Sequence, residues 1–216
     1  LITDEHYVIL NEMITNGSCK DITLRYNTNM SNFRYKKYDI LDMWSTFKEI
    51  EVSASLDHFG PKAEYIRNGT HWFTVENNLR TIRDVDFINY QFNCVLSNLN
   101  YVTLGDFFKY MIDKDLLRKH DYISIYHLLN PSFYSAQNLP LELKEQGTLG
   151  LLKVISEIKD DFWCTQHIQN ALNFANSDHT WEQNGKEFIH NTVRRDKIRN
   201  ENFVETFPEL ASMING

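Results

Sequence analysis

Polar residues occupy every second position of a segment that otherwise has the pattern of a buried strand. In the predicted strand 48–57, Ser53, Ser55 and Asp57 share one face because side chains alternate along a strand. The opposite face is apolar: Ile50, Val52, Ala54 and Leu56. Hydroxyls can donate and accept hydrogen bonds, and a carboxylate can also act as a general base. This face therefore predicts a site for a polar ligand.

Two further segments repeat the arrangement. In the predicted strand 21–29, Asn27 and Asn29 lie opposite an apolar face, and the strand 87–97 opposes Asn and Gln to apolar residues. A doubly wound sheet is apolar on both faces, and a closed eight-stranded barrel is filled with aliphatic side chains. Three half-polar strands therefore favour a wider or incomplete barrel whose lumen holds water and a polar ligand. An antiparallel sheet with one wet face is the alternative.

Helical patterns separate these strands. The first precedes residue 21 and ends near Asn16-Gly17, and others cover 40–47, 63–82 and 103–114, the last with Thr103 as N-cap. A fourth strand is predicted at 122–130, and after Pro140 the pattern indicates helices alone, at 141–158, 162–176 and 181–199. Strict alternation favours parallel strands joined by right-handed crossovers. We therefore predict an α/β fold with a C-terminal helical extension.

Composition limits the class of protein. The chain has 216 residues, of which 42% are hydrophobic and 24% charged, as in one folded domain. Its net charge of -7 argues against nucleic acid as a partner. No apolar run is long enough for a membrane span, and the first residues lack the pattern of a signal peptide. We expect a cytoplasmic protein that binds neither nucleic acid nor membrane.

Three cysteines lie far apart, at Cys19, Cys94 and Cys164, and they form no C-x2-C pair. Such sparse cysteines indicate a protein of a reducing compartment, and they predict no local zinc or iron–sulfur site. Four strands cannot close a barrel, and the chain opens at Leu1 with a helix that has no strand before it. We therefore expect a longer protein with further β-α units upstream. A start codon directly before Leu1 would overturn this expectation.

Several segments, in order, resemble radical S-adenosylmethionine (SAM) enzymes. Residues 52–57 (Val-Ser-Ala-Ser-Leu-Asp) with 63–70 (Ala-Glu-Tyr-Ile-Arg-Asn-Gly-Thr) are similar to the family's fourth strand and following helix. Residues 24–29 resemble its third strand, and 1–4 resemble the residues after its Gly-Gly-Glu-Pro motif. The chain looks most like the subgroup of this family that has a short "twitch" C-terminal region. Residues 196–199 and 203–210 are similar to the C-terminal tail of that subgroup.

The resemblance implies a partial (β/α)6 TIM-like barrel. Residues 1–158 would form its later β-α units, from the helix after strand 2 onward, and 159–216 a twitch-like extension. It also implies the activity: a 4Fe–4S cluster cleaves SAM reductively to a 5′-deoxyadenosyl radical, which abstracts hydrogen from a substrate, a peptide being one candidate. The cluster's C-x3-C-x2-C loop would lie before Leu1. We therefore expect no metal ligand in this chain and no activity from it alone. A flavodoxin or ferredoxin would donate the electron.

The resemblance also assigns cofactor-binding residues. Ser55 and Asp57 would contact the ribose hydroxyls or the methionine carboxylate of SAM, and Arg67 would reach the carboxylate. Weaker candidates are Asn27, Asn29, Ser53 and Asn98. Asn98 lies where the family contacts adenine, although residues 94–98 lack the family's Gly and Glu. Structural alternatives are a helix N-cap for Asp57 before Pro61, and a surface ion pair of Arg67 with Glu64.

Two other functions fit the same strands. One is a non-redox (β/α)-barrel lyase with Asp57 as general base, and the other is an inactive barrel that serves as a binding scaffold. In the C-terminal third, Cys164 is the one cysteine, so we predict no auxiliary cluster there. Trp163 and Cys164 are predicted to be core or substrate-facing residues.

Overall fold

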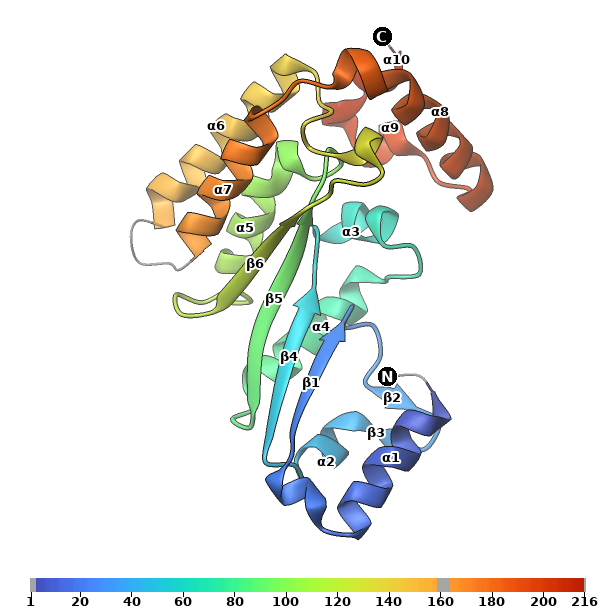
Figure 1. Cartoon of the computed structure of the whole chain (residues 1–216), viewed down its shortest axis with the longest axis vertical. Helices are drawn as coiled ribbons and strands as arrows, with labels where there is room; N and C mark the ends of the chain where they lie inside the picture. Colours follow the sequence, from blue (N-terminus) through green and yellow to red (C-terminus); the bar gives the residue numbers. More distant parts are fainter. Residues whose placement is uncertain (1–2, 159–163, 216) are drawn as a thin grey trace. The chain divides into compact units, whose positions relative to one another are not determined.

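The computed structural model describes residues 3–158 and 164–215, and its four main strands form one parallel sheet (Figure 1). Across the sheet the order is β1 (Thr23–Thr28), β4 (Glu49–Ser55), β5 (Ile88–Leu96) and β6 (Tyr122–His127). β1 pairs with β4 from Thr23 opposite Glu49 to Thr28 opposite Ala54. The predicted α/β class is confirmed, and the antiparallel alternative is wrong.

The chain divides into two compact units, which are described separately. Unit 1 consists of Leu1–Ser55 and Thr70–Phe92, and unit 2 of Leu56–Gly69 and Asn93–Gly216. The boundary between these units does not coincide with the predicted domain boundary at residue 158. The helices α6 and α7, before and after that residue, belong to the same unit. The domains 1–158 and 159–216 stay a prediction from the resemblance.

Unit 1 is built around β1, β4 and the first half of β5. Its other elements are α1 (Asp4–Thr15), η1 (Ser18–Asp21), β2 (Arg34–Tyr35), β3 (Tyr38–Asp39), α2 (Ile40–Trp44) and α4 (Trp72–Arg83). Alternate residues of β4, namely Ile50, Val52 and Ala54, are fully buried, as the strand pattern predicted. Gly17, at a φ of +79°, lets the chain turn after α1, where the sequence predicted a helix end.

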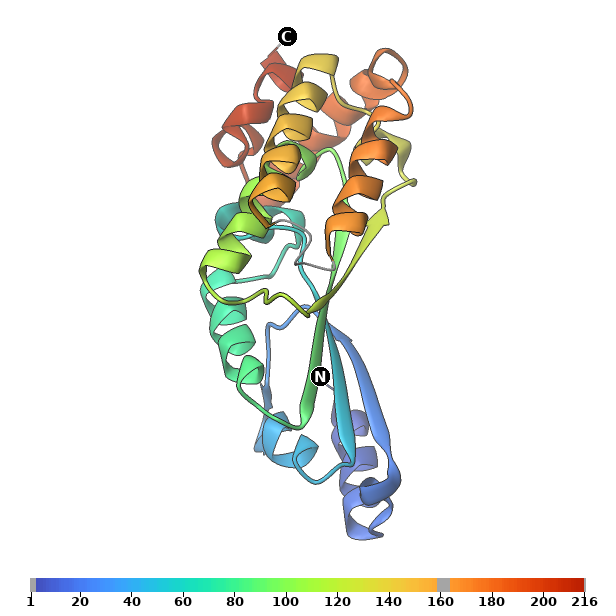
Figure 2. The ribbon, with the colours of Figure 1, turned by 90° about the vertical axis from the view of Figure 1, so that its left-hand side faces the viewer.

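Unit 2 contains the rest of β5, β6 and most of the helices. They are α3 (Gly60–Ile66), η2 (Tyr101–Thr103), α5 (Leu104–Asp113), η3 (Ser132–Tyr134), α6 (Leu141–Ile158), α7 (Cys164–Asn176), α8 (Trp181–Arg199), α9 (Phe203–Thr206), η5 (Pro208–Leu210) and α10 (Ser212–Asn215). α6 packs against both α5 and α7 (Figures 1 and 2). A Cβ on Gly105 would lie 2.7 Å from the Gly150 carbonyl oxygen, so α5 and α6 touch through their backbones.

Two sequence predictions differ from the structure. The single helix expected over 63–82 is broken into α3 and α4, because Gly69 adopts a φ of +85° between them. Thr103 precedes α5 but makes no capping hydrogen bond, since its hydroxyl binds other side chains of unit 2. The hairpin β2–β3 was not predicted, because two-residue strands are too short to show alternation.

Candidate functional site

Asp57 and Arg67 form an ion pair in unit 2. Asp57 lies two residues after β4, and Arg67 directly follows α3. Gly60, at a φ of +59°, and Pro61 in the first turn start α3, whose length brings the chain back toward Asp57. The Nε of Arg67 donates to Oδ2 of Asp57 at 2.7 Å. The side chain of Asp57 is 5% exposed and that of Arg67 31%, so the pair is shielded on the carboxylate side.

The second oxygen of Asp57 is also used. Its Oδ1 accepts a hydrogen bond of 2.8 Å from the backbone N–H of Val95, near the carboxyl end of β5. Both carboxylate oxygens are therefore held by the protein, one by a backbone group and one by a cation. Such a carboxylate is fixed in orientation and keeps its partner fixed as well.

Asn100, which the sequence analysis missed, connects the chain segments around Asp57. Its Nδ2 donates to the carbonyl oxygens of Asp57, at 3.0 Å, and Val95, at 2.9 Å. Its Oδ1 accepts from the backbone N–H of Ser97 at 2.8 Å. Asn100 is fully buried, so these bonds satisfy backbone groups that water does not reach. One side chain thus stabilises the backbone at the end of β5 and at Asp57.

Arg67 retains binding capacity beyond this pair. Among the described residues, its two terminal nitrogens have no hydrogen-bond partner, and Nε alone is bound. A guanidinium presents five N–H donors and binds carboxylates through two parallel hydrogen bonds. Because the side chain is partly exposed, a carboxylate from solution can reach the terminal nitrogens while Nε stays on Asp57. The arrangement can bind a carboxylate-bearing ligand.

Cys94 lies beside this cluster and is inert. It is fully buried, and its Sγ is 3.8 Å from Nδ2 of Asn100. Burial, followed by the charge of Asp57, raises the pKa of its thiol well above the usual value. The thiol stays protonated, and a protonated thiol is neither a good nucleophile nor a metal ligand.

His58 begins a second buried network of unit 2. Its ring stacks against the rings of Phe59 and Phe107, and its Nε2 lies 3.0 Å from Oγ1 of Thr103. Burial, with a smaller effect from the charge of Lys62, lowers the pKa of His58 to about 4. The ring is therefore neutral at physiological pH and acts as a packed hydrogen-bonding group.

The network continues to the C-terminal tail. The Nζ of Lys62 donates to Oε1 of Glu209 at 2.6 Å and to Oγ1 of Thr103 at 3.1 Å. Lys62 belongs to α3 and Glu209 to η5. The tail is thereby tied to the helix that separates Asp57 from Arg67. Sequence reasoning missed this contact because nearly 150 residues lie between the partners.

In unit 1, Ser53 and Ser55 lie at alternate positions of β4. Ser53 is buried, and its Oγ accepts a hydrogen bond of 2.5 Å from Nε2 of Gln91 on β5. Ser55 is half-buried at the last position of the strand. Ser53 of β4 and Gln91 of β5 therefore lie on the same face of the sheet, in agreement with the polar face predicted for each strand. Ser53 uses its hydroxyl within the sheet.

Asn27 and Asn29 line a pocket of unit 1 at the end of β1. It has a volume of about 540 Å³ and is lined by Thr3, His6, Tyr26, Asn27, Thr28 and Asn29, none of them charged at neutral pH. The Nε2 of His6 lies 3.0 Å from the Tyr26 hydroxyl, and burial lowers the pKa of His6. Its Nδ1 is buried with no partner among the described residues. The pocket suits a neutral, polar group.

Asn98 is fully buried at the end of β5 in unit 2. Its Nδ2 donates to the carbonyl oxygen of Phe133, and its backbone N–H donates to that of Tyr134, each at 2.9 Å. Its Oδ1 is buried without a partner in the described part of the chain. Buried carbonyls without partners are rare, and this one leaves an acceptor unsatisfied.

Of the predicted site residues, the structure brings Asp57 and Arg67 into direct contact. Both structural alternatives for them are wrong, since Asp57 caps no helix and Arg67 pairs with it. Asn98 lies in the same unit, and the other four candidates lie in unit 1. Trp163 is outside the described residues, and the side chain of Cys164 is not described either.

The described residues contain no group of three His, Cys, Asp or Glu side chains that could hold a metal ion. No helix in the same part of the chain is long and apolar enough to cross a membrane. Comparison with known family models, curated proteins and solved structures finds no match.

Proposed function

We propose that this chain supplies the later β-α units of a radical SAM enzyme with a partial (β/α)6 TIM-like barrel. The support is a parallel sheet with polar residues at alternate positions, together with an ion pair formed inside the segment that carries the resemblance. With a bound 4Fe–4S cluster, SAM supplies the radical that removes hydrogen from a substrate. The cluster ligands would lie upstream of Leu1.

The observation that carries the proposal is that the terminal nitrogens of Arg67 have no hydrogen-bond partner in the part of the chain that the structure describes. These nitrogens would bind the carboxylate of SAM, while Nε remains on Asp57. Asp57 is then a positioning residue, which differs from the direct contact that the resemblance implied. Its two oxygens are already bound, so it orients Arg67 and neutralises part of its charge.

The remaining candidates stay predictions from the resemblance. Ser55, with Asn27, Asn29 and Ser53 as weaker candidates, belongs to unit 1, and the hydroxyl of Ser53 is already bound to Gln91. Asn98 belongs to unit 2, and its Oδ1 is buried with no partner in the described part of the chain. A flavodoxin or ferredoxin as electron donor, a peptide as one candidate substrate, and a cytoplasmic location complete the proposal.

A barrel lyase with Asp57 as general base has less support. A general base needs an oxygen that can reach a substrate proton. Both oxygens of Asp57 are bound, and its side chain is 5% exposed. No contact of the described residues favours the scaffold function over the enzyme.

Titration calorimetry with SAM tests the proposal. Arg67→Gln should weaken SAM binding roughly ten- to hundredfold, because it removes charge-assisted hydrogen bonds. Arg118→Gln is the matched control, since Arg118 is an exposed arginine of the same unit that pairs with Asp115. This variant should bind SAM like the parent chain. Equal affinities for all three chains, or no SAM binding by the parent, would contradict the proposal.

A further inference from the structure

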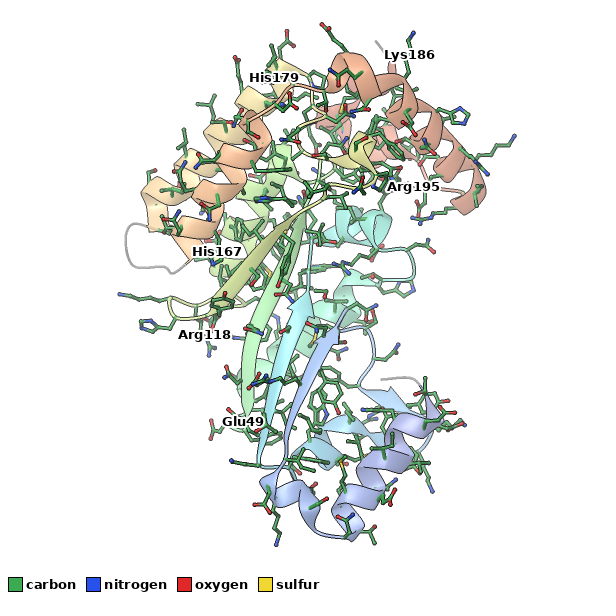
Figure 3. All side chains as sticks on the ribbon, viewed as in Figure 1. Glu49, Arg118, His167, His179, Lys186 and Arg195 are labelled. Atoms are coloured by element: carbon green, nitrogen blue, oxygen red, sulfur yellow. The ribbon has the colours of Figure 1, made fainter. Side chains whose placement is uncertain are left out.

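One face of α8 carries a shallow, open surface pocket between the side chains of this helix. Its volume is about 520 Å³, and it is lined by Lys186, Ile189, His190, Val193, Arg194 and Lys197. These residues repeat at intervals of three and four, so they share one side of the helix. Lys186, labelled in Figure 3, is exposed on this side. We call the six residues the α8 groove.

The opposite side of α8 is packed into unit 2. Phe188 is fully buried against Tyr134, Trp181 and Phe203. The guanidinium of Arg195 lies 4.2 Å from the ring centre of Tyr65. The hydroxyl of Tyr65 and the backbone N–H of Phe203 both donate to Asp196 at 2.7 Å. These contacts hold the buried side of α8 against unit 2. The α8 groove therefore lies on a helix whose position is fixed by packing.

The α8 groove combines cations with exposed apolar surface. Val193 is 53% exposed at its centre. Lys186, Arg194 and Lys197 surround it, and none of the three forms an ion pair with a described residue. Glu182 lies one turn before Lys186, and Glu187 lies beside it. On a chain with a net charge of -7, this face is locally basic.

We propose that the α8 groove docks an acidic, amphipathic segment of another protein. Apolar side chains of the segment contact Ile189 and Val193, and its carboxylates pair with Lys186, Arg194 and Lys197. Charge complementarity selects the partner, and burial of the apolar centre adds affinity. A nucleic acid fits less well, because a phosphate backbone offers nothing to the apolar centre and the chain as a whole repels it. The docking surface is independent of the proposed SAM site.

Fluorescence anisotropy with a designed helical peptide tests this proposal. The peptide carries Leu at i, i+3, i+4 and i+7 and Glu on the flanking positions. Two comparison peptides replace every Glu by Lys or every Leu by Ser, and a single-stranded RNA oligonucleotide serves as the fourth probe. The acidic leucine peptide should bind most tightly, and its affinity should fall with added salt.

Charge reversal makes the test specific. The variant Lys186→Glu/Arg194→Glu/Lys197→Glu should lose roughly tenfold or more in affinity for the acidic peptide and should gain binding of the Lys peptide. The control variant Lys109→Glu/Lys119→Glu/Lys153→Glu changes three exposed lysines of the same unit and should leave binding within about twofold. The proposal is overturned if the acidic peptide does not bind, if both variants bind it equally, if the Ser peptide binds as well, or if RNA binds more tightly.

Discussion

The polar groups of the two units are organised in opposite ways. In unit 2, both carboxylate oxygens of Asp57 are bound, and the amide of Asn100 ties the surrounding backbone together. In unit 1, Asn27 and Asn29 are exposed in an open pocket, where Nδ1 of His6 has no partner among the described residues. The Asp57 cluster therefore has its geometry set before a ligand arrives. The side chains of Asn27 and Asn29 in the unit 1 pocket are exposed to solvent instead.

Removing Asp57 should have the largest effect on stability. In Asp57→Ala, the Arg67 charge and the Val95 N–H lose their partner, and breaking such a shielded pair costs about 3 kcal/mol. Urea denaturation measures the loss. Glu51→Gln breaks the exposed Arg25 pair of unit 1 and should cost less than about 1 kcal/mol. If both variants lost the same free energy of unfolding, the Asp57 pair of unit 2 would be no more important for stability than the exposed pair of unit 1.

Low pH should reduce the folding stability of unit 2 because His58 is buried in its neutral form. Its folded pKa of about 4 is below the unfolded value of 6.5, so the unfolded chain takes up the proton first. Stability from this group is present above pH 6.5 and is lost as the pH falls toward 4, by about 2 kcal/mol between pH 7 and pH 5. His58→Phe should flatten this part of the profile, whereas exposed His120→Gln should not. If His58→Phe kept the same dependence of stability on pH as the parent chain, His58 would not be the cause of the loss in acid.

Asn29 of the unit 1 pocket should have the smallest effect on folding. Asn29→Ala removes an exposed side chain with one local bond to the Ser31 N–H. The substitution should change the free energy of unfolding by less than about 0.5 kcal/mol in urea denaturation. A loss comparable to that of Asp57→Ala would mean that the pocket is part of the structural framework.

Strand faces and helix positions could be predicted because they depend on local periodicity. Ile50, Val52 and Ala54 alternate with polar residues in the sequence, and the structure buries them. The break of the helix over 63–82 could not be located, because Asn68-Gly69 inside a helical pattern is compatible with a continuous helix as well as with a turn.

The candidate site could be predicted as a set of residues but not as a set of contacts. Asp57 and Arg67 were identified, yet their direct pair was not, since sequence spacing equally allows a cap or a pair with Glu64. Asn100 was missed because its partners are backbone groups, which leave no trace in residue types. Glu209 was missed because its contact with Lys62 depends on tertiary folding.

The central claim is that Arg67 binds the carboxylate of SAM while Asp57 orients it. The most direct measurement compares SAM with decarboxylated SAM on the parent chain and on Arg67→Gln by titration calorimetry. Loss of the ligand carboxylate should weaken binding to the parent roughly tenfold or more and should barely change binding to the variant, a coupling of about 1.5–3 kcal/mol. Equal weakening in both chains would contradict the claim, because the carboxylate would then be bound elsewhere.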